Sequence, residues 1–242
     1  MNNRNIVFVF ILFILLSCSD KSEKMKYKIS SINEASVFSN EWDDPDWKEI
    51  EAISLDNFMG EKPDHFPETQ VKVAYDEQAI YIKFKVSDRY VKAVYSNHQD
   101  PVYKDSCVEF FFTPGSDISE GYFNLEMNCI GTMLFHHQKV PRQNAIGISE
   151  TDIGKVKVIT SLTELIDPEK VDNVDWQVSY RIPFSILDHY HDFDKPGPGT
   201  VWKANFYKCA DDSSHPHWLT WAPIDNPTPD FHRPEFFGEL HF

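Results

Sequence analysis

Apolar and polar residues alternate along most of the chain. In residues 79–86 every second side chain is apolar and shares one face, while Tyr81, Lys83 and Lys85 share the other. A period of two residues predicts a half-buried β-strand. The pattern predicts about ten strands in all, at residues 71–75, 79–86, 107–113, 122–128, 132–136, 155–163, 175–182, 201–209, 218–221 and 238–242.

These strands predict one all-β domain, an antiparallel β-sandwich, over residues 32–242. No stretch keeps helical periodicity for three turns, and only Pro183–Leu187 fits a short helical turn. The 15 prolines fall largely in connections, and no repeat or linker divides this region. Two long irregular stretches, residues 43–69 and 211–237, are of a length that usually carries function.

The N-terminal residues predict export. Residues 1–17 combine Arg4 with the apolar run 6–16, which fits a signal peptide and is too short to span a bilayer. Leu15-Leu16-Ser17-Cys18 resembles a bacterial lipobox, which implies cleavage before Cys18 and lipid attachment to its sulfur. Residues 18–31 would then be a lipidated cysteine and tether, and the protein would lie in the bacterial cell envelope, periplasmic or surface-exposed. The alternative is plain cleavage, with Cys18 incidental.

Charge and cysteine content argue against a nucleic-acid-binding protein and against a disulfide-stabilised scaffold. The chain has 23 Lys and Arg against 38 Asp and Glu, so removing Arg4 with the signal leaves 22 − 38 = −16. Nucleic-acid binding needs clustered basic residues and is therefore not expected. Cys107, Cys129 and Cys209 are far apart in the sequence and form no Cys-x-x-Cys motif, so at most one disulfide can form among them.

Two predicted strands carry polar side chains on the face opposite their apolar set. In residues 107–113, Glu109 shares its face with Phe111. In residues 122–128, Asn124, Glu126 and Asn128 share a face. A carboxylate beside an aromatic ring suits a sugar, whose C–H face packs on the ring while its hydroxyls donate to the carboxylate. If the strands pair, these rows lie side by side, although any solvated sheet face is also polar.

The C-terminal region adds aromatic and charged candidates. Trp218 and Trp221 lie three residues apart, so in a strand one points to the core and the other is available to a ligand. In the stretch FHRPEFFG (231–238), His232 and Arg233 are candidates to face a ligand. Alternatively, Arg233 pairs with Glu235 and only decorates the final strand.

Several stretches, in order, resemble the family 9 carbohydrate-binding modules and their DOMON-like relatives. They are VKVAYDEQAIYIKFKVSD (71–88), VYKDSCVEFFFTPG (102–115), YFNLEMNCIGTML (122–134), WQVSYRIPFSIL (176–187) and FHRPEFFGELHF (231–242). The resemblance covers roughly residues 32–242 and implies a β-sandwich that binds a mono- or oligosaccharide, at a chain end in known members, without catalysis.

The resemblance also implies residue roles. Tyr103 would be one stacking platform, at a position where the family has Trp, and Trp218 or Trp221 the other. The polar contacts would come from Glu109, Asn124, Glu126, Asn128 and Arg233, and His232 would shape the cleft wall. Family members bind structural calcium, for which the candidate ligands here are Asp76, Asp88 and Asp105.

Other functions stay open at this point. Some DOMON-like domains bind haem through Met with His or Lys, and Met127 and Met133 lie on predicted strands. Glu109 and Glu126 could form the carboxylate pair of a glycoside hydrolase. Histidine pairs such as His215 and His217 lack a third partner at a recognised metal-site spacing. A lipoprotein that only docks to a glycan-degrading complex would need no exposed aromatic cleft.

Overall fold

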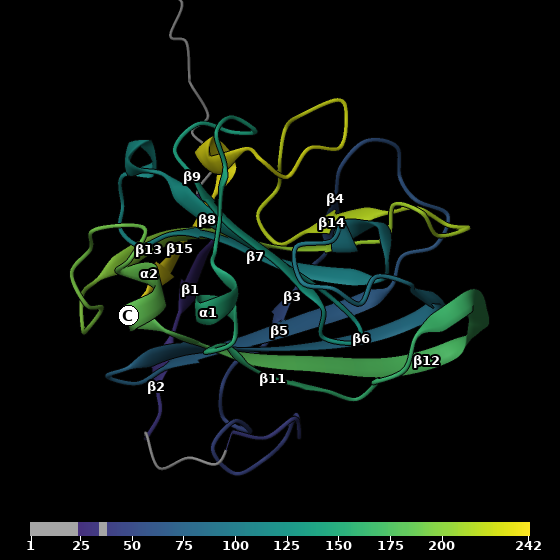
Figure 1. Cartoon of the computed structure of the whole chain (residues 1–242), viewed down its shortest axis with the longest axis horizontal. Coiled ribbons are helices and arrows are strands. Elements are labelled where there is room, and N and C mark those ends of the chain that lie inside the picture. The colour runs from purple at the N-terminus through teal and green to yellow at the C-terminus, as the bar shows by residue number, and fades with distance from the viewer. Residues whose placement is uncertain (1–23, 34–37) are drawn as a thin grey trace, which may run out of the picture.

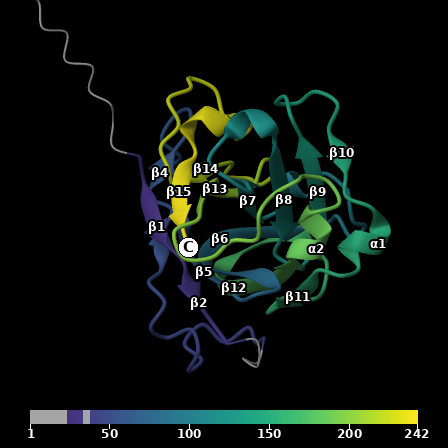
Figure 2. The ribbon, with the colours of Figure 1, turned by 90° about the vertical axis from the view of Figure 1, so that its left-hand side faces the viewer.

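The computed structural model describes residues 24–33 and 38–242, which form two β-sheets packed face to face (Figures 1 and 2). The predicted signal peptide, residues 1–17, and the predicted lipidation site, Cys18, lie outside the described residues. Within the described ranges, no helix has the length and apolar character needed to cross a membrane. The fold is the β-sandwich that the alternation predicts.

The first sheet has nine strands, and its main path runs in the order β1-β15-β13-β7-β8-β9-β10. Strand β14 pairs with β13 and also with β4. Neighbouring strands are antiparallel except β1 and β15, which are parallel. The strands are β1 (Lys26–Lys28), β4 (Asn57–Phe58), β7 (Cys107–Thr113), β8 (Tyr122–Asn128), β9 (Met133–Gln138), β10 (Ile146–Gly147), β13 (Val201–Cys209), β14 (Trp218–Thr220) and β15 (Gly238–His241).

The second sheet has six strands in the order β11-β12-β6-β5-β2, with β3 also paired to β5. They are β2 (Ser30–Ser31), β3 (Ile53–Ser54), β5 (Glu68–Tyr75), β6 (Ala79–Ala93), β11 (Lys157–Thr160) and β12 (Ile166–Pro183). The described residues contain two short α-helices, α1 (Glu150–Ile153) and α2 (Phe184–Leu187). Short 3-10 turns occur at Val102–Lys104, Ile118–Glu120 and Pro234–Phe236.

The core lies between the sheets and uses the apolar faces that the alternation predicts. The alternate residues of β6, β7 and β8 all turn inward: Ile80, Ile82, Phe84, Val86, Val108, Phe110, Phe112, Phe123, Leu125 and Met127. The Phe112 ring stacks on Phe110 with centroids 4.3 Å apart, and on Phe123 at 5.2 Å. Each fully buried side chain of this size contributes about 1.5–3 kcal/mol. The core therefore fixes which side chains of β7 and β8 point outward.

Part of the outer face of the second sheet is covered, which alternation alone did not predict. Lys83 of β6 is 1% exposed, forms an ion pair with Asp44 at 2.7 Å and lies over the Trp47 ring at 4.4 Å. The long connection before β3 supplies both partners. The predicted polar row of β7 and β8 belongs to the first sheet and meets a cavity on the outer face of that sheet.

The folded domain includes residues that the sequence analysis assigned to the tether. Lys26–Lys28 pair with β15, and Ser30–Ser31 pair with β5. Tyr27 is buried, and its hydroxyl donates to the Glu51 carbonyl at 2.6 Å. The alternation of apolar and polar residues in this stretch is too short to distinguish it from a polar tether. The folded domain therefore begins at about residue 26 and not at residue 32.

Candidate functional site

A cleft lies on the outer face of the first sheet, where β7, β8 and β13 form its floor. The 3-10 turn Val102–Lys104, the segment after β13 and the loop before β15 supply its walls. Its volume is about 210 Å³, below the roughly 300–1,000 Å³ of drug-sized ligand sites and suited to a single sugar ring. It is lined by Tyr103, Glu109, Phe111, Glu126, Arg142, Cys209, Asp211, Trp218, Pro229, Asp230, Phe231 and His232.

Glu109 stands at the centre of the floor. It is 2% exposed, and its Oε1 accepts a hydrogen bond from the Cys209 thiol at 3.1 Å. Its other oxygen, Oε2, is buried without a hydrogen-bond partner. Burial, and next the neighbouring Cys209 and Glu126, raise the pKa of Glu109 well above its usual range. The carboxyl group therefore has an unused hydrogen-bonding position, on a residue that lines the cleft.

Glu126 lies directly opposite Glu109 on the neighbouring strand. The Asn124 amide donates to its Oε1 at 3.0 Å, while Oε2 is also buried without a partner. The Gln138 side chain of β9 donates in turn to Asn124 Oδ1 at 2.9 Å, which fixes the orientation of the Asn124 side-chain amide. Burial raises the pKa of Glu126 to about 7, although Asn124 and Arg142 oppose the shift. Two carboxyl groups on one floor thus each keep one free oxygen.

Aromatic side chains form the walls beside these carboxyl groups. Tyr103 and Trp218 are partly exposed and both line the cleft. The Trp218 indole donates to Asp211 Oδ1 at 2.8 Å, which holds the ring in place. Trp221, on the opposite face of the segment, is 3% exposed and packs on Phe206 in the core. Of the two tryptophans, Trp221 therefore belongs to the core and Trp218 is the partly exposed one.

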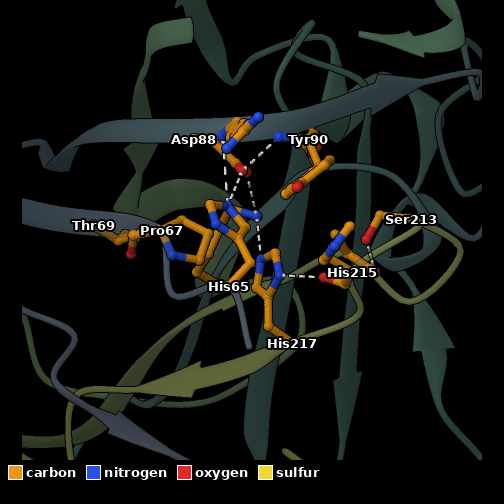
Figure 3. A network of polar contacts seen from close by, with 12 residues as sticks. His65, Pro67, Thr69, Asp88, Tyr90, Ser213, His215 and His217 are labelled. Atoms are coloured by element: carbon orange, nitrogen blue, oxygen red, sulfur yellow. Dashed lines mark hydrogen bonds and ion pairs between the residues drawn. The ribbon is translucent and has the colours of Figure 1, made fainter. Parts of the chain in front are cut away.

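A buried polar network holds the residue that precedes Trp218. His217 accepts from the Lys208 ammonium group at 2.7 Å through Nε2, and its Nδ1 lies 2.9 Å from the His215 carbonyl (Figure 3). Lys208 forms an ion pair with Asp88 at 3.2 Å, and Asp88 also contacts His65 Nε2 at 2.7 Å. Burial, followed by the Lys208 charge, lowers the pKa of His217 to about 3. Because His217 stays neutral, it accepts from Lys208 and fixes the start of β14.

The outer wall is made by loops that meet across the cleft. Arg142, between β9 and β10, forms an ion pair with Asp230 at 2.7 Å. His232 Nδ1 lies 2.8 Å from the Tyr122 hydroxyl, and burial lowers the pKa of His232 to about 4. Phe231 stacks on Tyr207 with centroids 4.1 Å apart. The stretch from Pro229 to His232 is therefore held over the sheet by an ion pair, a ring stack and several hydrogen bonds, including one from the Tyr207 hydroxyl to the Phe231 carbonyl at 3.2 Å.

The structure brings five of the predicted binding residues to one cleft and places four elsewhere. Those in the cleft are Tyr103, Glu109, Glu126, Trp218 and His232. Asn124 lies behind Glu126 and orients it. Asn128 instead donates to Asp105 and to the Tyr95 carbonyl. Trp221 belongs to the core.

Arg233 does not line the cleft. Its guanidinium forms an ion pair with Glu235 at 2.7 Å and donates to Asn226 Oδ1 at 2.7 Å. It also lies over the Phe236 ring. The structure therefore contains the alternative, in which Arg233 pairs with Glu235. Two acceptors on the same loop, Glu235 and Asn226, reach the Arg233 guanidinium.

Three charged residues that line the cleft were not predicted from the sequence: Arg142, Asp211 and Asp230. Asp211 and Asp230 fall in the long irregular stretch 211–237, so only its length pointed to them. Arg142 has a positive φ of 59° in the connection after β9, where no alternation identifies a facing direction. These residues reach the cleft through loop conformation, which a strand pattern does not encode.

The three predicted calcium ligands lie in separate surroundings and do not fit one calcium site. Asp76 accepts from the Gln78 and Ala79 amides and the Tyr81 hydroxyl at the β5–β6 turn. Asp88 belongs to the network with His65 and Lys208. Asp105 accepts from two backbone amides and from Asn128. Protein donors already use these carboxylates, which leaves no shared oxygen cage.

The two methionines considered for haem ligation face the core. Met127 and Met133 pair across β8 and β9, and both are at most 1% exposed. Their neighbours are the apolar residues between the sheets. This placement fits the alternation, which assigned Met127 to the apolar face.

Comparisons with known proteins agree with this fold. A profile of carbohydrate-binding family 9 matches residues 44–242. A Bacteroides uniformis protein, provisionally described as carbohydrate-binding, is 30% identical with a TM-score of 0.80, over 91% of this chain and 100% of its own. Two structures of a family 9 module from Caldicellulosiruptor kristjanssonii, solved with glucose and with cellotriose, each have 19% identity and a TM-score of 0.61. They cover 90% of this chain and 95% and 93% of their own. A search of the curated proteins found no significant match. The extent of the profile match and the similarity to the B. uniformis protein show that the chain belongs to carbohydrate-binding family 9.

Proposed function

We propose that the cleft binds one ring of a neutral sugar, with Tyr103 and Trp218 as stacking surfaces and Glu109 and Glu126 as partners for hydroxyl groups. The observation that carries this proposal is the pair of buried carboxyl oxygens without partners, Glu109 Oε2 and Glu126 Oε2. A buried polar atom that lacks a hydrogen bond costs about 1–3 kcal/mol. A ligand rich in hydroxyl groups removes that cost when it binds, and an apolar ligand does not.

The charges around the cleft favour a neutral ligand over an acidic one. Four carboxyl groups line it, those of Glu109, Glu126, Asp211 and Asp230, against the single guanidinium of Arg142. Arg142 is already paired with Asp230. A uronic acid would therefore find no unpaired cation among the residues that line the cleft. Glucose and cellotriose, found in the two Caldicellulosiruptor structures, are therefore the first ligands to test.

The arrangement supports binding without hydrolysis. Glycoside hydrolases place two carboxyl groups on either side of the scissile bond. Here Glu109 and Glu126 project from neighbouring strands into the same floor, so both meet a sugar from one side. Arg142, Asp211 and Asp230 stand around the walls, but Asp230 is paired with Arg142 and Asp211 with the Trp218 indole. A reaction therefore lacks an opposing, free carboxyl group at the cleft.

The N-terminal sequence supports a cell-envelope role. We propose that Cys18 carries lipid, and that the domain presents bound sugar at the membrane surface to glycan-degrading enzymes. A Cys18→Ser variant, expressed in a bacterium with lipoprotein processing, is expected to move from the membrane fraction to the soluble fraction. Retention in the membrane fraction would show that another segment anchors the protein.

Calorimetric titration of the mature protein against mono- and oligosaccharides tests the binding proposal. Heat is expected with neutral hexoses or their oligomers and not with uronic acids, and Tyr103→Ala is expected to weaken it. Reducing-sugar assays on the same samples test for hydrolysis, and none is expected. Folded protein that gives no heat across the panel would contradict direct binding and favour a docking role.

A further inference from the structure

Two cysteines and a glutamate converge beneath the sugar cleft. Cys107 opens β7 and Cys209 ends β13, and the antiparallel register places them directly opposite one another. Glu109 follows Cys107 by two residues and therefore points from the same face of β7. One ligand atom from each residue, the two Sγ atoms and a carboxylate oxygen, lie within 4.8 Å of one another. Among the described residues, this is the group of His, Cys, Asp and Glu side chains that meets this criterion.

The members of this cluster keep their coordinating atoms available. Both cysteines carry free thiols. The Cys209 thiol donates to Glu109 Oε1 at 3.1 Å, but Glu109 Oε2 has no partner although the residue is only 2% exposed. A buried carboxyl oxygen without a hydrogen bond costs free energy, so it points to a missing group. That observation is independent of the convergence of the two sulfur atoms.

The ligand set selects the type of ion. Calcium and magnesium require oxygen ligands, whereas two sulfurs and one carboxylate suit a borderline or soft ion such as Zn²⁺. Tetrahedral ligands at about 2.0–2.3 Å from zinc lie about 3.3–3.8 Å from one another. Ligand atoms within 4.8 Å reach this spacing by small side-chain rotations. On binding, each thiol and the Glu109 carboxyl group release their protons to solvent as the metal–sulfur and metal–oxygen bonds form.

The cleft provides both access and a further coordination position. Glu109 and Cys209 line it, so an ion reaches them from solvent without opening the core. Cys107 lies behind them and is fully buried. We propose that Cys107, Glu109 and Cys209 bind a thiophilic divalent metal ion, Zn²⁺, whose fourth position faces the sugar cleft. This site stands on the cluster itself and does not require that a sugar binds.

Cobalt titration of the reduced, metal-free mature protein tests the proposal. Tetrahedral thiolate coordination is expected to produce a sulfur-to-cobalt charge-transfer band that saturates at one ion per chain and disappears when Zn²⁺ is added. Cys209→Ser and Cys107→Ser are expected to lose the band. The matched control is Cys129→Ser, because Cys129 is also a buried free thiol but lies outside the cluster; it should keep the band and its stoichiometry.

Glu109→Gln provides a second variant in case the serine substitutions unfold the protein. It keeps both sulfurs and the side-chain shape but removes the carboxylate ligand. Affinity for Co²⁺ is expected to fall more than about 100-fold. Mutating a residue that only hydrogen-bonds to a metal ligand already lowers metal affinity about 10–100-fold. Sugar titrations of the metal-free and metal-loaded wild type report separately on the sugar cleft.

Three results would overturn the metal site. The first is cobalt binding without a charge-transfer band, which would place the ion on surface histidines. The second is a band that survives Cys209→Ser in folded protein. The third is a Cys107–Cys209 disulfide in protein isolated without reductant, because a disulfide removes both sulfur ligands. It would be detected as a single free thiol, that of Cys129, among Cys107, Cys129 and Cys209.

Discussion

Glu109 of β7 and Glu126 of β8 occupy directly opposite positions in neighbouring strands, and each carboxyl group keeps one buried oxygen without a hydrogen-bond partner. Side chains at opposite positions lie about 4.5–5.5 Å apart at Cβ. A folded domain normally satisfies such atoms or replaces them with apolar groups. For Glu126 a hydroxyl-rich ligand explains this retention, and for Glu109 either that ligand or the proposed metal ion does.

Replacing Glu126 with Gln tests this explanation at one atom pair. Glu126→Gln keeps the side-chain shape but removes the carboxylate, and hydrogen bonds to charged groups contribute about 1.5–3 kcal/mol. Sugar affinity, measured by calorimetry above pH 7, where Glu126 is ionised, is expected to fall roughly 10- to 100-fold. Glu235→Gln, at an exposed position outside the cleft, is the matched control and should leave affinity unchanged. Equal affinities of both variants and the wild type would remove Glu126 from the site.

The two C-terminal tryptophans should separate binding from stability. Trp218→Ala removes a wall of the cleft and is expected to weaken sugar binding at least about tenfold, which is 1.4 kcal/mol. Trp221→Ala opens a cavity in the core and is expected to lower the free energy of unfolding by about 3–5 kcal/mol. Urea unfolding and calorimetry on both variants measure the two effects. The assignment of roles would be reversed if Trp221→Ala lost affinity while remaining as stable as the wild type.

Arg142 and Arg233 offer a similar contrast among charged residues. Arg142→Gln removes the ion pair with Asp230 and loosens the wall from Pro229 to His232, so sugar dissociation should become severalfold faster. Arg233→Gln removes contacts outside the cleft and should leave dissociation unchanged. Because both arginines form partly exposed ion pairs, each substitution should cost only about 1 kcal/mol or less in stability. Stopped-flow kinetics can decide whether Arg142 or Arg233 controls ligand release.

His217 should make folding stability depend on pH below neutrality. Its pKa is lowered to about 3 by burial, with Lys208 and His65 also opposing protonation while Asp88 and the His215 carbonyl favour it. An unfolded histidine has a pKa of about 6.5. As pH falls from 6.5, the unfolded chain takes up a proton that the folded chain does not, so stability falls by up to about 1.4 kcal/mol per pH unit.

A His217→Gln variant isolates this contribution. Glutamine retains an acceptor for Lys208 but does not titrate, so the stability difference between wild type and variant should shrink as pH falls from 7 to 4. Urea unfolding at several pH values measures it. Parallel stability curves would mean that His217 is protonated in the folded protein as readily as in the unfolded chain.

The strand pattern predicted much of the fold because burial has a period of two residues. Phe110 and Phe112 entered the core as expected, and Glu109 and Glu126 became neighbours on the opposite face. The same reasoning placed one of the two nearby tryptophans in the core. These predictions concern side chains whose direction follows from the strand itself.

The rest of the site depends on loops, in which buried and exposed residues do not alternate with a regular period. Arg142 and Asp230 meet although 88 residues separate them, and Arg142 does so at a positive φ. Arg233 turned to acceptors within its own loop. Lys83 lies on the face opposite the core, where the segment containing Asp44 covers it. In each case tertiary contacts between irregular segments decide where the side chain points.

A crystal structure of the protein soaked with glucose or cellotriose would show whether this cleft holds a sugar. We expect a sugar ring against Trp218, with hydroxyl oxygens within hydrogen-bond distance of Glu109 Oε2 and Glu126 Oε2. A sugar bound elsewhere, for example in the separate cavity lined by Arg181, Phe184 and Lys195, with this cleft holding only solvent, would contradict this expectation.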